Sequence, residues 1–280
     1  MIRRKFRPKI AKLWVSDSRK IGRDTKFTLR HRTSFALSLP PIIFEDAALL
    51  AFDKPSGLAV APDPVDRKRP DLTSEVRAKF GAQAANVHRL DPETSGIVLF
   101  AKTKPALDVV SGQFQSKTVE KRHLALVVGA PAENTFVIDA KLAHDESDRR
   151  RMRIGGRGAE PAVSHFLVLE RFGAFTLLEC RPLTGRLHQL RLHLASLKLP
   201  ILNDALYGNE TKLLLSSLKR GYKGRADEQP LMDHLALHAS DLVLKHPETR
   251  DSLSLHADVP HEFDVALKYL RKFVEPRRRR

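Results

Sequence analysis

The sequence is poor in cysteine, with Cys180 as the single thiol among 280 residues. One thiol excludes an internal disulfide and suits a reducing compartment, so we expect a cytoplasmic protein. Cys180 stands in the apolar, strand-like run "TLLECRPL". That setting favours a packed core thiol over a nucleophile.

The residue groupings that usually hold a metal are also missing. Two histidine pairs are closely spaced, His188 with His193 and His234 with His238. The second pair falls in a strand-like segment, which would place both imidazoles on one side. No cysteine pair or carboxylate cluster joins either pair, as zinc sites usually require. We therefore expect no metal site.

Long apolar runs and nucleotide-binding motifs are absent as well. No stretch reaches the roughly 18 residues that span a bilayer, so we expect no membrane partner. The N-terminal "MIRRKFRPKIAKLW" lacks the apolar core of a secretory signal, and Pro8 interrupts the helix that a transit peptide needs. The patterns "GxxxxGK[ST]", "GxGxxG" and "GxSxG" do not occur, which removes support for nucleotide cofactors and esterase chemistry.

Positive charge is what the sequence has in excess. It carries 49 Lys and Arg against 33 Asp and Glu, a formal net charge of +16. Such an excess attracts phosphate backbones over long distances and favours a nucleic-acid partner over a merely solvated surface. Part of it lies at the two ends, so we expect a basic extension over residues 1–40, a folded domain over 41–275 and a basic tail over 276–280.

Short strand-like runs outnumber helical ones between these ends. The segment 163–183 predicts two strands around a turn at Phe172 and Gly173, which form a hairpin. Helical spacing of apolar residues recurs in "KPALDVVSGQFQS" and "HEFDVALKYLRKF". The sequence therefore predicts an α+β fold, with a mixed, mostly antiparallel sheet flanked by helices.

The stretch "HRLDPETSGIVLFAKT", residues 88–103, is the first that can carry chemistry. It places Asp91 directly before a turn and a buried-type strand, where a carboxylate is held rigidly while its head faces a cleft. Its neighbour Arg89 can reach a phosphate or occupy space in a nucleic-acid stack. The alternative is that Asp91 only caps the turn formed by Pro92 and Gly96, and this stretch alone leaves both open.

The second stretch is "LTGRLHQLRLHL", residues 183–194, which we interpret as a helix with Thr184 as its N-cap. One face then carries four leucines, Leu187, Leu190, Leu194 and Leu197. His188, Arg191, Leu192 and Ala195 share another face, whose basic side chains suit a phosphate or a carboxylate. A solvated basic face is the alternative, although such a face would more often carry lysine and glutamate.

With these stretches in view, the chain resembles the pseudouridine synthases of the RluA type. The likeness rests on "HRLDPETSGIVLFAKT", "LTGRLHQLRLHL" and "LALHASDLVLKHPETRDSL", in that order, with weaker echoes in "FDKPSGLAV" and "LPILNDALYG". It covers about residues 41–262. The resemblance implies a pseudouridine synthase-like core and an isomerase that converts uridines of structured RNA, ribosomal or transfer, to pseudouridine. It implies no cofactor, and we expect a monomer.

The resemblance also implies roles for single residues. Asp91 matches the catalytic aspartate of the family. Arg89 matches the arginine that enters the RNA stack when the target base is flipped, and Arg191 matches the basic residue that pairs with the catalytic carboxylate. Leu192, beside it, is expected to support the site. We further expect the loop arginines of "DRRRMRIGGR", Arg149, Arg150 and Arg151, to add sequence-independent RNA contacts.

The chain departs from the family pattern at two positions. The element Lys-x-Tyr-x-Ala reads "KRHLA", so His123 stands where the active-site tyrosine is expected, and Asn203 replaces a glycine. An imidazole keeps a flat face and a polar edge for the flipped uracil, but it titrates near neutrality, so we expect a rate change around pH 6 to 7. This departure leaves one alternative open, a non-catalytic RNA-binding protein on the same fold.

A glycoside hydrolase that uses Asp91 and Glu93 is a further alternative. Two carboxylates so close along a turn rarely reach the opposed geometry, about 5 Å or more across a sugar, that such enzymes need. The basic charge also argues against neutral glycans.

Overall fold

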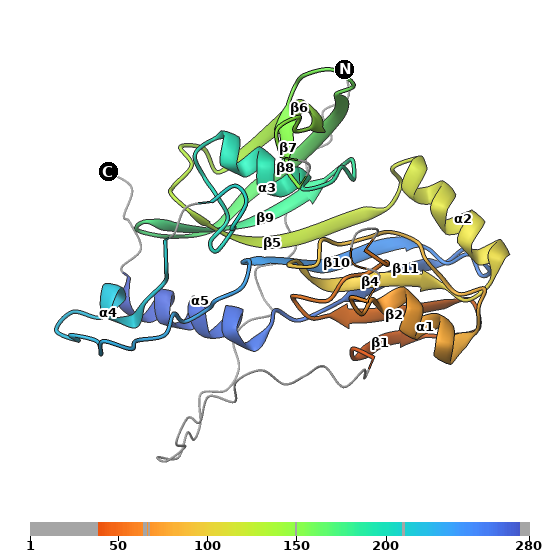
Figure 1. Ribbon diagram of the computed structural model, residues 1–280, viewed down its shortest axis with the longest axis horizontal. Helices are drawn as coiled ribbons and strands as arrows, with labels where there is room; N and C mark the ends of the chain where they lie inside the picture. Colours follow the sequence, from red (N-terminus) through yellow and green to blue (C-terminus); the bar gives the residue numbers. More distant parts are fainter. Residues whose placement is uncertain (1–38, 64–65, 67, 149, 209–210, 275–280) are drawn as a thin grey trace, which may run out of the picture. The chain divides into compact units, whose positions relative to one another are not determined.

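The computed structural model describes residues 39–274 except 64–65, 67, 149 and 209–210 (Figure 1). Nearly all of the two predicted basic arms, and Arg149, lie outside these residues. Within the described part of the chain, no helix is both long enough and apolar enough to cross a membrane.

One sheet of eleven strands runs through the described residues. Nine follow in the order β1 (Ile42–Glu45), β2 (Leu49–Lys54), β4 (Ser95–Ala101), β10 (Leu237–Lys245), β5 (Glu120–Val128), β9 (Phe175–Pro182), β8 (Glu160–Phe172), β6 (Thr135–His144) and β7 (Met152–Ile154). Two more, β3 (Ala85–Asn86) and β11 (Ser252–His256), pair with β4 and β10. Among the described pairs only β4 with β10 is parallel, so the predicted mixed, mostly antiparallel sheet is confirmed.

Five helices are found in the described residues: α1 (Leu72–Phe80), α2 (Lys104–Gln115), α3 (Gln189–Ser196), α4 (Leu215–Leu218) and α5 (His261–Phe273) (Figure 1). α1 and α2 cover opposite faces of β2 and β4, because alternate side chains of a strand point to opposite sides. Leu50 and Val98 pack with α1, whereas Leu49 and Leu99 pack with α2. Every residue of β4 is therefore buried, as its unbroken apolar run predicts.

β4 and β10 lie unusually close, because Gly96 has no side chain. A Cβ there would come within 2.2 Å of the Ala239 carbonyl oxygen, and the φ of +106° also favours glycine. This contact sets the loop before β4, which carries Asp91, against the middle of the sheet. The next strands in order, β5 and β9, then bring His123 and the segment after Pro182 to the same place.

A further apolar cluster surrounds β5 and β9. There α5 buries Phe263, Leu267 and Leu270 in the same cluster as Leu190 and Leu194 of α3. Cys180 belongs to this cluster, fully buried, which confirms the packed-thiol interpretation. Burial raises the pKa of this thiol far above its ordinary range.

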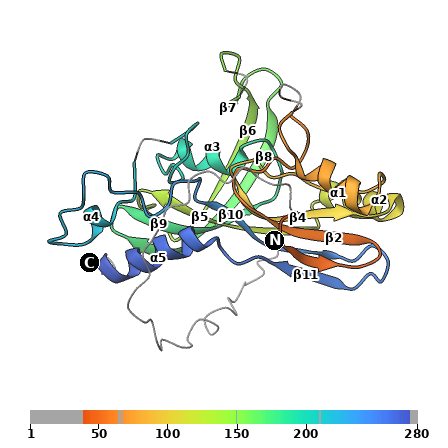
Figure 2. The same ribbon diagram turned by 60° about the horizontal axis from the view of Figure 1, so that its bottom comes forward.

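Three local predictions were wrong. Helix α3 begins at Gln189 rather than near Thr184, because the Thr184 hydroxyl donates to Gln189 Oε1 across a turn. Leu187 precedes α3 and Leu197 follows its last residue, and both leucines, expected in the leucine face, are exposed. The polar loop after His144 contains a short strand, β7, that pairs with the edge of β6 opposite to β8 (Figure 2). His234 precedes β10 rather than lying in it, so strand alternation does not place it on one side with His238.

Candidate active site

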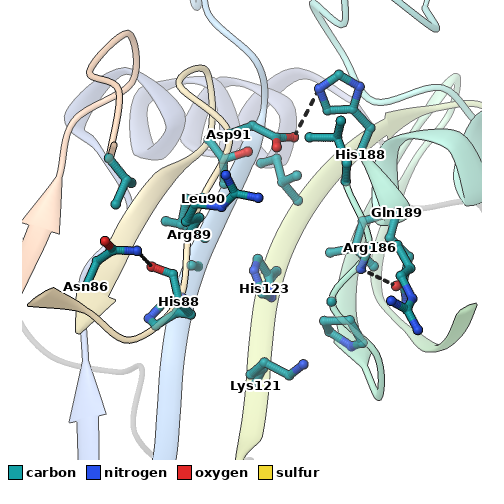
Figure 3. A pocket seen from close by; sticks show the side chains of 18 of the residues that line it. Asn86, His88, Arg89, Leu90, Asp91, Lys121, His123, Arg186, His188 and Gln189 are labelled. Carbon is teal, nitrogen blue, oxygen red and sulfur yellow. Dashed lines mark hydrogen bonds and ion pairs between the residues drawn. The ribbon is translucent and has the colours of Figure 1, made fainter. Parts of the chain in front are cut away.

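A pocket of about 1100 Å³ opens where the loop before β4, strands β5 and β10 and the turn before α3 meet (Figure 3). Its lining includes Arg89 and Asp91 from the loop, His123 from β5 and His188 and Arg191 from the turn and α3. Residues about 100 positions apart in the sequence thus face one cavity. The Asp91 carboxylate is only partly buried and faces this cavity. Its two interpretations, a functional carboxylate in a pocket and a residue that only caps a turn, can therefore be separated by experiment.

The loop that carries Asp91 is fastened to the loop after β2. The Gly57 N–H donates to the Pro92 carbonyl at 2.7 Å, and the Ser56 hydroxyl donates to the Glu93 carbonyl at 2.6 Å. The Thr94 N–H closes the turn on the Asp91 carbonyl at 3.1 Å. These bonds hold the backbone on both sides of the carboxylate, which gives it the rigid mount that the sequence predicted.

Lys54 forms hydrogen bonds to both of these loops. Its side chain is fully buried, and Nζ donates to the carbonyl oxygens of Pro55, Leu58 and Pro92, each at 2.9 Å. Burial lowers its pKa to about 7, although Glu93 and Asp91 nearby act in the opposite direction. Sequence reasoning missed this residue, because "FDKPSGLAV" gives no sign that its lysine points inward.

Arg191 lies at the base of the pocket with only 2% of its surface exposed. Nε and Nη2 each donate to the Asp204 carboxylate at 2.8 Å, while Nη1 lies 3.5 Å from Asp91 Oδ2 and 3.5 Å from Glu93 Oε2. The predicted neighbours Arg191 and Asp91 are thus brought together, but the tighter partner is Asp204. The basic face expected on this helix is buried at Arg191, not solvated.

For both Arg191 and Asp204, the effect of their ion pair on the pKa exceeds the effect of burial. Burial alone would lower the pKa of Arg191, yet the hydrogen bonds and charge of Asp204 raise it above its usual value. Burial would likewise raise the pKa of Asp204, and Arg191 holds it below the usual range. The arginine therefore stays charged beneath Asp91. Sequence reasoning missed Asp204, whose only signal was the weak echo "LPILNDALYG".

His123 projects from β5 into the pocket region (Figure 3). Its Nδ1 is buried and has no hydrogen-bond partner among the described residues. Burial lowers its pKa to about 3, and the charge of Lys121 acts in the same direction. This corrects the expectation of a rate change around pH 6 to 7 from this residue, because the imidazole is already neutral there.

Of the remaining predicted site residues that the structure describes, some line the pocket and others do not. Arg89 is exposed and lines the pocket. Arg150 also lines it and forms a surface ion pair with Asp148 at 2.9 Å, whereas the Arg151 guanidinium lies over the Tyr207 ring at 5.1 Å. Leu192 does not line the pocket, since it packs against the apolar cluster of β6, β7 and β8.

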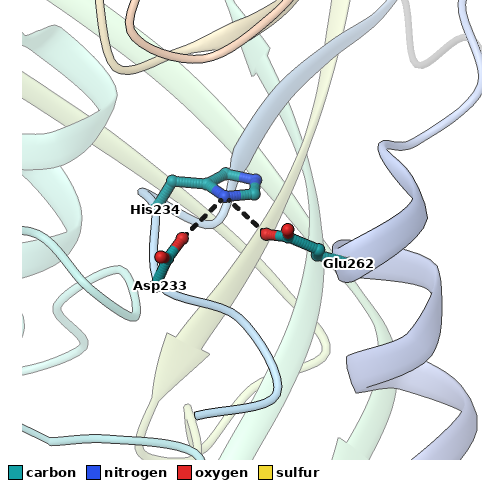
Figure 4. A group of neighbouring side chains, drawn as sticks. All are labelled: Asp233, His234 and Glu262. Carbon is teal, nitrogen blue, oxygen red and sulfur yellow. Dashed lines mark hydrogen bonds and ion pairs between the residues drawn. The ribbon is translucent and has the colours of Figure 1, made fainter. Parts of the chain in front are cut away.

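One group of possible metal ligands occurs among the described residues, away from the pocket lining. Asp233, His234 and Glu262 have ligand atoms within 4.8 Å of one another (Figure 4). His234 Nδ1 lies 3.4 Å from the Asp233 carboxylate and 3.0 Å from that of Glu262. Both carboxylates are exposed, and Glu262 stands in the first turn of α5, where a negative charge is stabilising without an ion.

Asn203 supports the loop that carries His234. It has a φ of +62°, a conformation that asparagine tolerates better than most residues. Its Nδ2 donates to the carbonyl oxygens of Met232 and His234 at 2.9 and 3.0 Å. The asparagine thus keeps the left-handed backbone expected of a glycine and adds two hydrogen bonds.

Comparison with known proteins gives a consistent result. The sequence pattern of the family described as RNA pseudouridylate synthase matches residues 48–196. Ribosomal large subunit pseudouridine synthase D of Xanthomonas campestris is 36% identical over 245 residues, which covers 82% of this chain and 69% of that protein. The protein of the same name from Nitrosomonas europaea is 34% identical over 271 residues, covering 93% and 73%. The solved structure of human RNA pseudouridylate synthase domain containing 4 superposes with a TM-score of 0.64 at 26% identity, covering 82% of this chain and 92% of that one.

Proposed function

The chain belongs to the RNA pseudouridylate synthase family and is an isomerase, and on that premise we propose that Asp91 is its catalytic carboxylate and ribosomal RNA its substrate. The observation that carries the proposal is the contact between Asp91 and the buried Arg191 in a pocket bounded by the predicted motifs. The fixed cation beneath this carboxylate attracts it and orients it.

The reaction needs little from the protein beyond position and charge. In uridine the bond between C1' and N1 breaks, the uracil turns, C5 bonds to C1', and the C5 proton is lost while N1 gains one. An ionised Asp91 acts on the sugar, either as a nucleophile at C1' or as a base that removes a sugar proton. Atoms balance between substrate and product, so no co-reactant enters.

Access to the uridine requires that the base leave its stack, which costs a few kcal/mol. Arg89 is exposed at the pocket, next but one to Asp91, and fills the gap that the base leaves. His123 meets the flipped uracil with a neutral ring whose Nδ1 has no partner in the described residues. The net charge of +16 recovers part of the unstacking cost through phosphate contacts.

The wider setting is also part of the proposal. Residues 41–275 form the catalytic domain, with basic arms at 1–40 and 276–280, and the chain acts as a monomer in the cytoplasm. The buried free thiol Cys180 supports a reducing compartment. The names of the relatives favour ribosomal over transfer RNA as the substrate.

Pseudouridine mapping of total RNA from cells with and without this gene tests the proposal. We expect one or more ribosomal pseudouridines to disappear with the gene and to return with the parent chain but not with Asp91→Asn. Loss confined to transfer RNA would overturn the substrate. An unchanged map, together with retained RNA binding, would favour the second candidate, a non-catalytic RNA-binding protein, which His123 in place of tyrosine motivates.

A further inference from the structure

The backbone of His188 is left-handed, although the residue is not a glycine. It is the residue before α3, with φ +51° and ψ +21°, and its side chain makes no capping bond to the helix. A left-handed conformation at a residue other than glycine is strained. Such strain persists where surrounding contacts hold it, so the contacts of the imidazole decide what it does.

The imidazole is held by one phenol. His188 Nδ1 lies 3.0 Å from Tyr207 Oη, and the two rings meet edge to face. The same oxygen accepts the Met152 N–H at 2.6 Å. A phenol is both donor and acceptor, so its O–H is able to donate to His188 Nδ1 while its oxygen accepts from Met152. With the phenol as donor, a neutral imidazole carries its hydrogen on Nε2.

Nε2 in turn faces the carboxylate of Asp91. It lies 3.9 Å from Oδ2, the same oxygen that Arg191 Nη1 approaches to 3.5 Å. Oδ1 has no hydrogen bond or ion pair with any residue that the structure describes. The two oxygens of Asp91 are thus in different positions: one is approached by two nitrogen atoms, and the other has no partner among the described residues.

We propose that His188 is a positioning residue, whose Nε2–H holds Oδ2 of Asp91 together with Arg191 and leaves Oδ1 to act on the sugar. The inference rests on the proposed function, since it assigns a role toward Asp91. The gap of 3.9 Å closes when RNA fills the pocket, as catalytic hydrogen bonds commonly shorten in the bound complex.

The charges around His188 agree with a neutral donor. Burial lowers its pKa and Arg191 acts in the same direction, while the carboxylates of Asp91, Glu93 and Asp204 act against them. An imidazole that is neutral at pH 7 orients the carboxylate through a directional hydrogen bond rather than through charge attraction. The left-handed backbone is then the cost of turning the ring back toward the loop before β4.

The test uses a matched pair of variants in the full chain. His188→Asn tolerates the left-handed backbone, but its amide ends near the position of Nδ1 and cannot reach Oδ2. His188→Gln places an amide N–H near the position of Nε2. We expect His188→Asn to lower the single-turnover rate about 10²-fold with unchanged RNA affinity, as for a misplaced catalytic group, and His188→Gln to recover most of it.

A second readout does not depend on turnover. Long-range ¹H–¹⁵N correlation spectra of the histidine-labelled parent at pH 7 should show His188 protonated at Nε2 and not at Nδ1, and Tyr207→Phe should weaken that preference. A hydrogen on Nδ1, a parental rate in His188→Asn, or equal losses in the Asn and Gln variants would each overturn the inference. An active parent and an inactive Asp91→Asn would leave the proposed function standing in those cases, whereas a parent without product would remove both.

Discussion

The buried pair of Arg191 and Asp204 offers a quantitative test of how the pocket is built. Their side chains are 2% and 1% exposed, and two parallel bonds of 2.8 Å join them. Arg191→Met keeps a similar apolar length but removes the cation. Asp204 then keeps only the N–H groups of Leu206 and Tyr207, at 2.9 and 3.1 Å, to compensate a buried charge.

Removing one partner of a buried ion pair costs about 3–5 kcal/mol. In a domain of this size that corresponds to a fall in melting temperature of roughly 6–20 °C. We expect Arg191→Met to lose this stability in urea unfolding followed by circular dichroism. Its pseudouridine formation should also fall, because Asp91 loses its nearest cation.

The double variant Arg191→Met/Asp204→Asn decides the cause. The amide oxygen of asparagine still accepts the two backbone N–H groups but carries no charge, so the double variant should be more stable than Arg191→Met alone. Its activity should stay low, because the cation beneath Asp91 is still missing. A cost below about 1 kcal/mol for the single variant, or a double variant less stable than the single one, would refute the reasoning.

Four further predictions concern the rest of the pocket. His123→Ala should cut the single-turnover rate sharply while His123→Tyr retains or raises it, and a parental rate in the Ala variant would make the residue a bystander. Because the pKa of His123 is about 3 in the fold, its contribution to stability is present above pH 6.5 and is lost as pH falls toward 3. The free energy of unfolding of the parent should therefore fall more steeply with falling pH below pH 6.5 than that of His123→Tyr, by up to about 1.4 kcal/mol per pH unit. Equal slopes of unfolding free energy against pH would contradict this. Lys54→Met should leave the carbonyl oxygens of Pro55 and Leu58 without a donor and that of Pro92 with only the Gly57 N–H. It should cost about 1–3 kcal/mol in urea unfolding and lower turnover by loosening the loop at Pro92; unchanged turnover would show that these bonds are dispensable. Arg150→Ala should reduce the slope of log RNA affinity against log salt by about 0.7–0.9, and an unchanged slope would show that this arginine faces away from RNA.

The parts of the fold that the sequence predicted depend on local patterns. The unbroken apolar run after Asp91 became the buried strand β4, and the helical spacing near the C-terminus became α5. The turn at Phe172 and Gly173 joined β8 and β9 as predicted. In each case the periodicity of apolar residues reports which faces are covered, and few other arrangements satisfy it.

The errors arose where long-range contacts outweigh such patterns. The start of α3 was misplaced because the Thr184 hydroxyl is engaged by Gln189 and the Val163 N–H, which a helical wheel does not contain. The inward lysine Lys54 could not be recognised, because its acceptors come from backbone carbonyls of two loops.

The sequence likewise predicted only some of the residues of the site. The motifs placed Asp91 and Arg191 in one pocket, and they approach to 3.5 Å. They did not indicate Asp204, the tighter partner of Arg191, because carboxylate pairing across a turn leaves no periodic signal. They placed His123 at the pocket, where the family pattern has a tyrosine, but did not give its pKa, which depends on how deeply the strand is covered.

The central claim is that Asp91 performs the chemistry and does not serve RNA binding. The most direct measurement compares the parent and Asp91→Asn, both as full chains, on ribosomal RNA from cells that lack the gene. The account predicts equal RNA affinity for both proteins, pseudouridine from the parent and none from the variant. Pseudouridine formed by Asp91→Asn at the parental rate would contradict it.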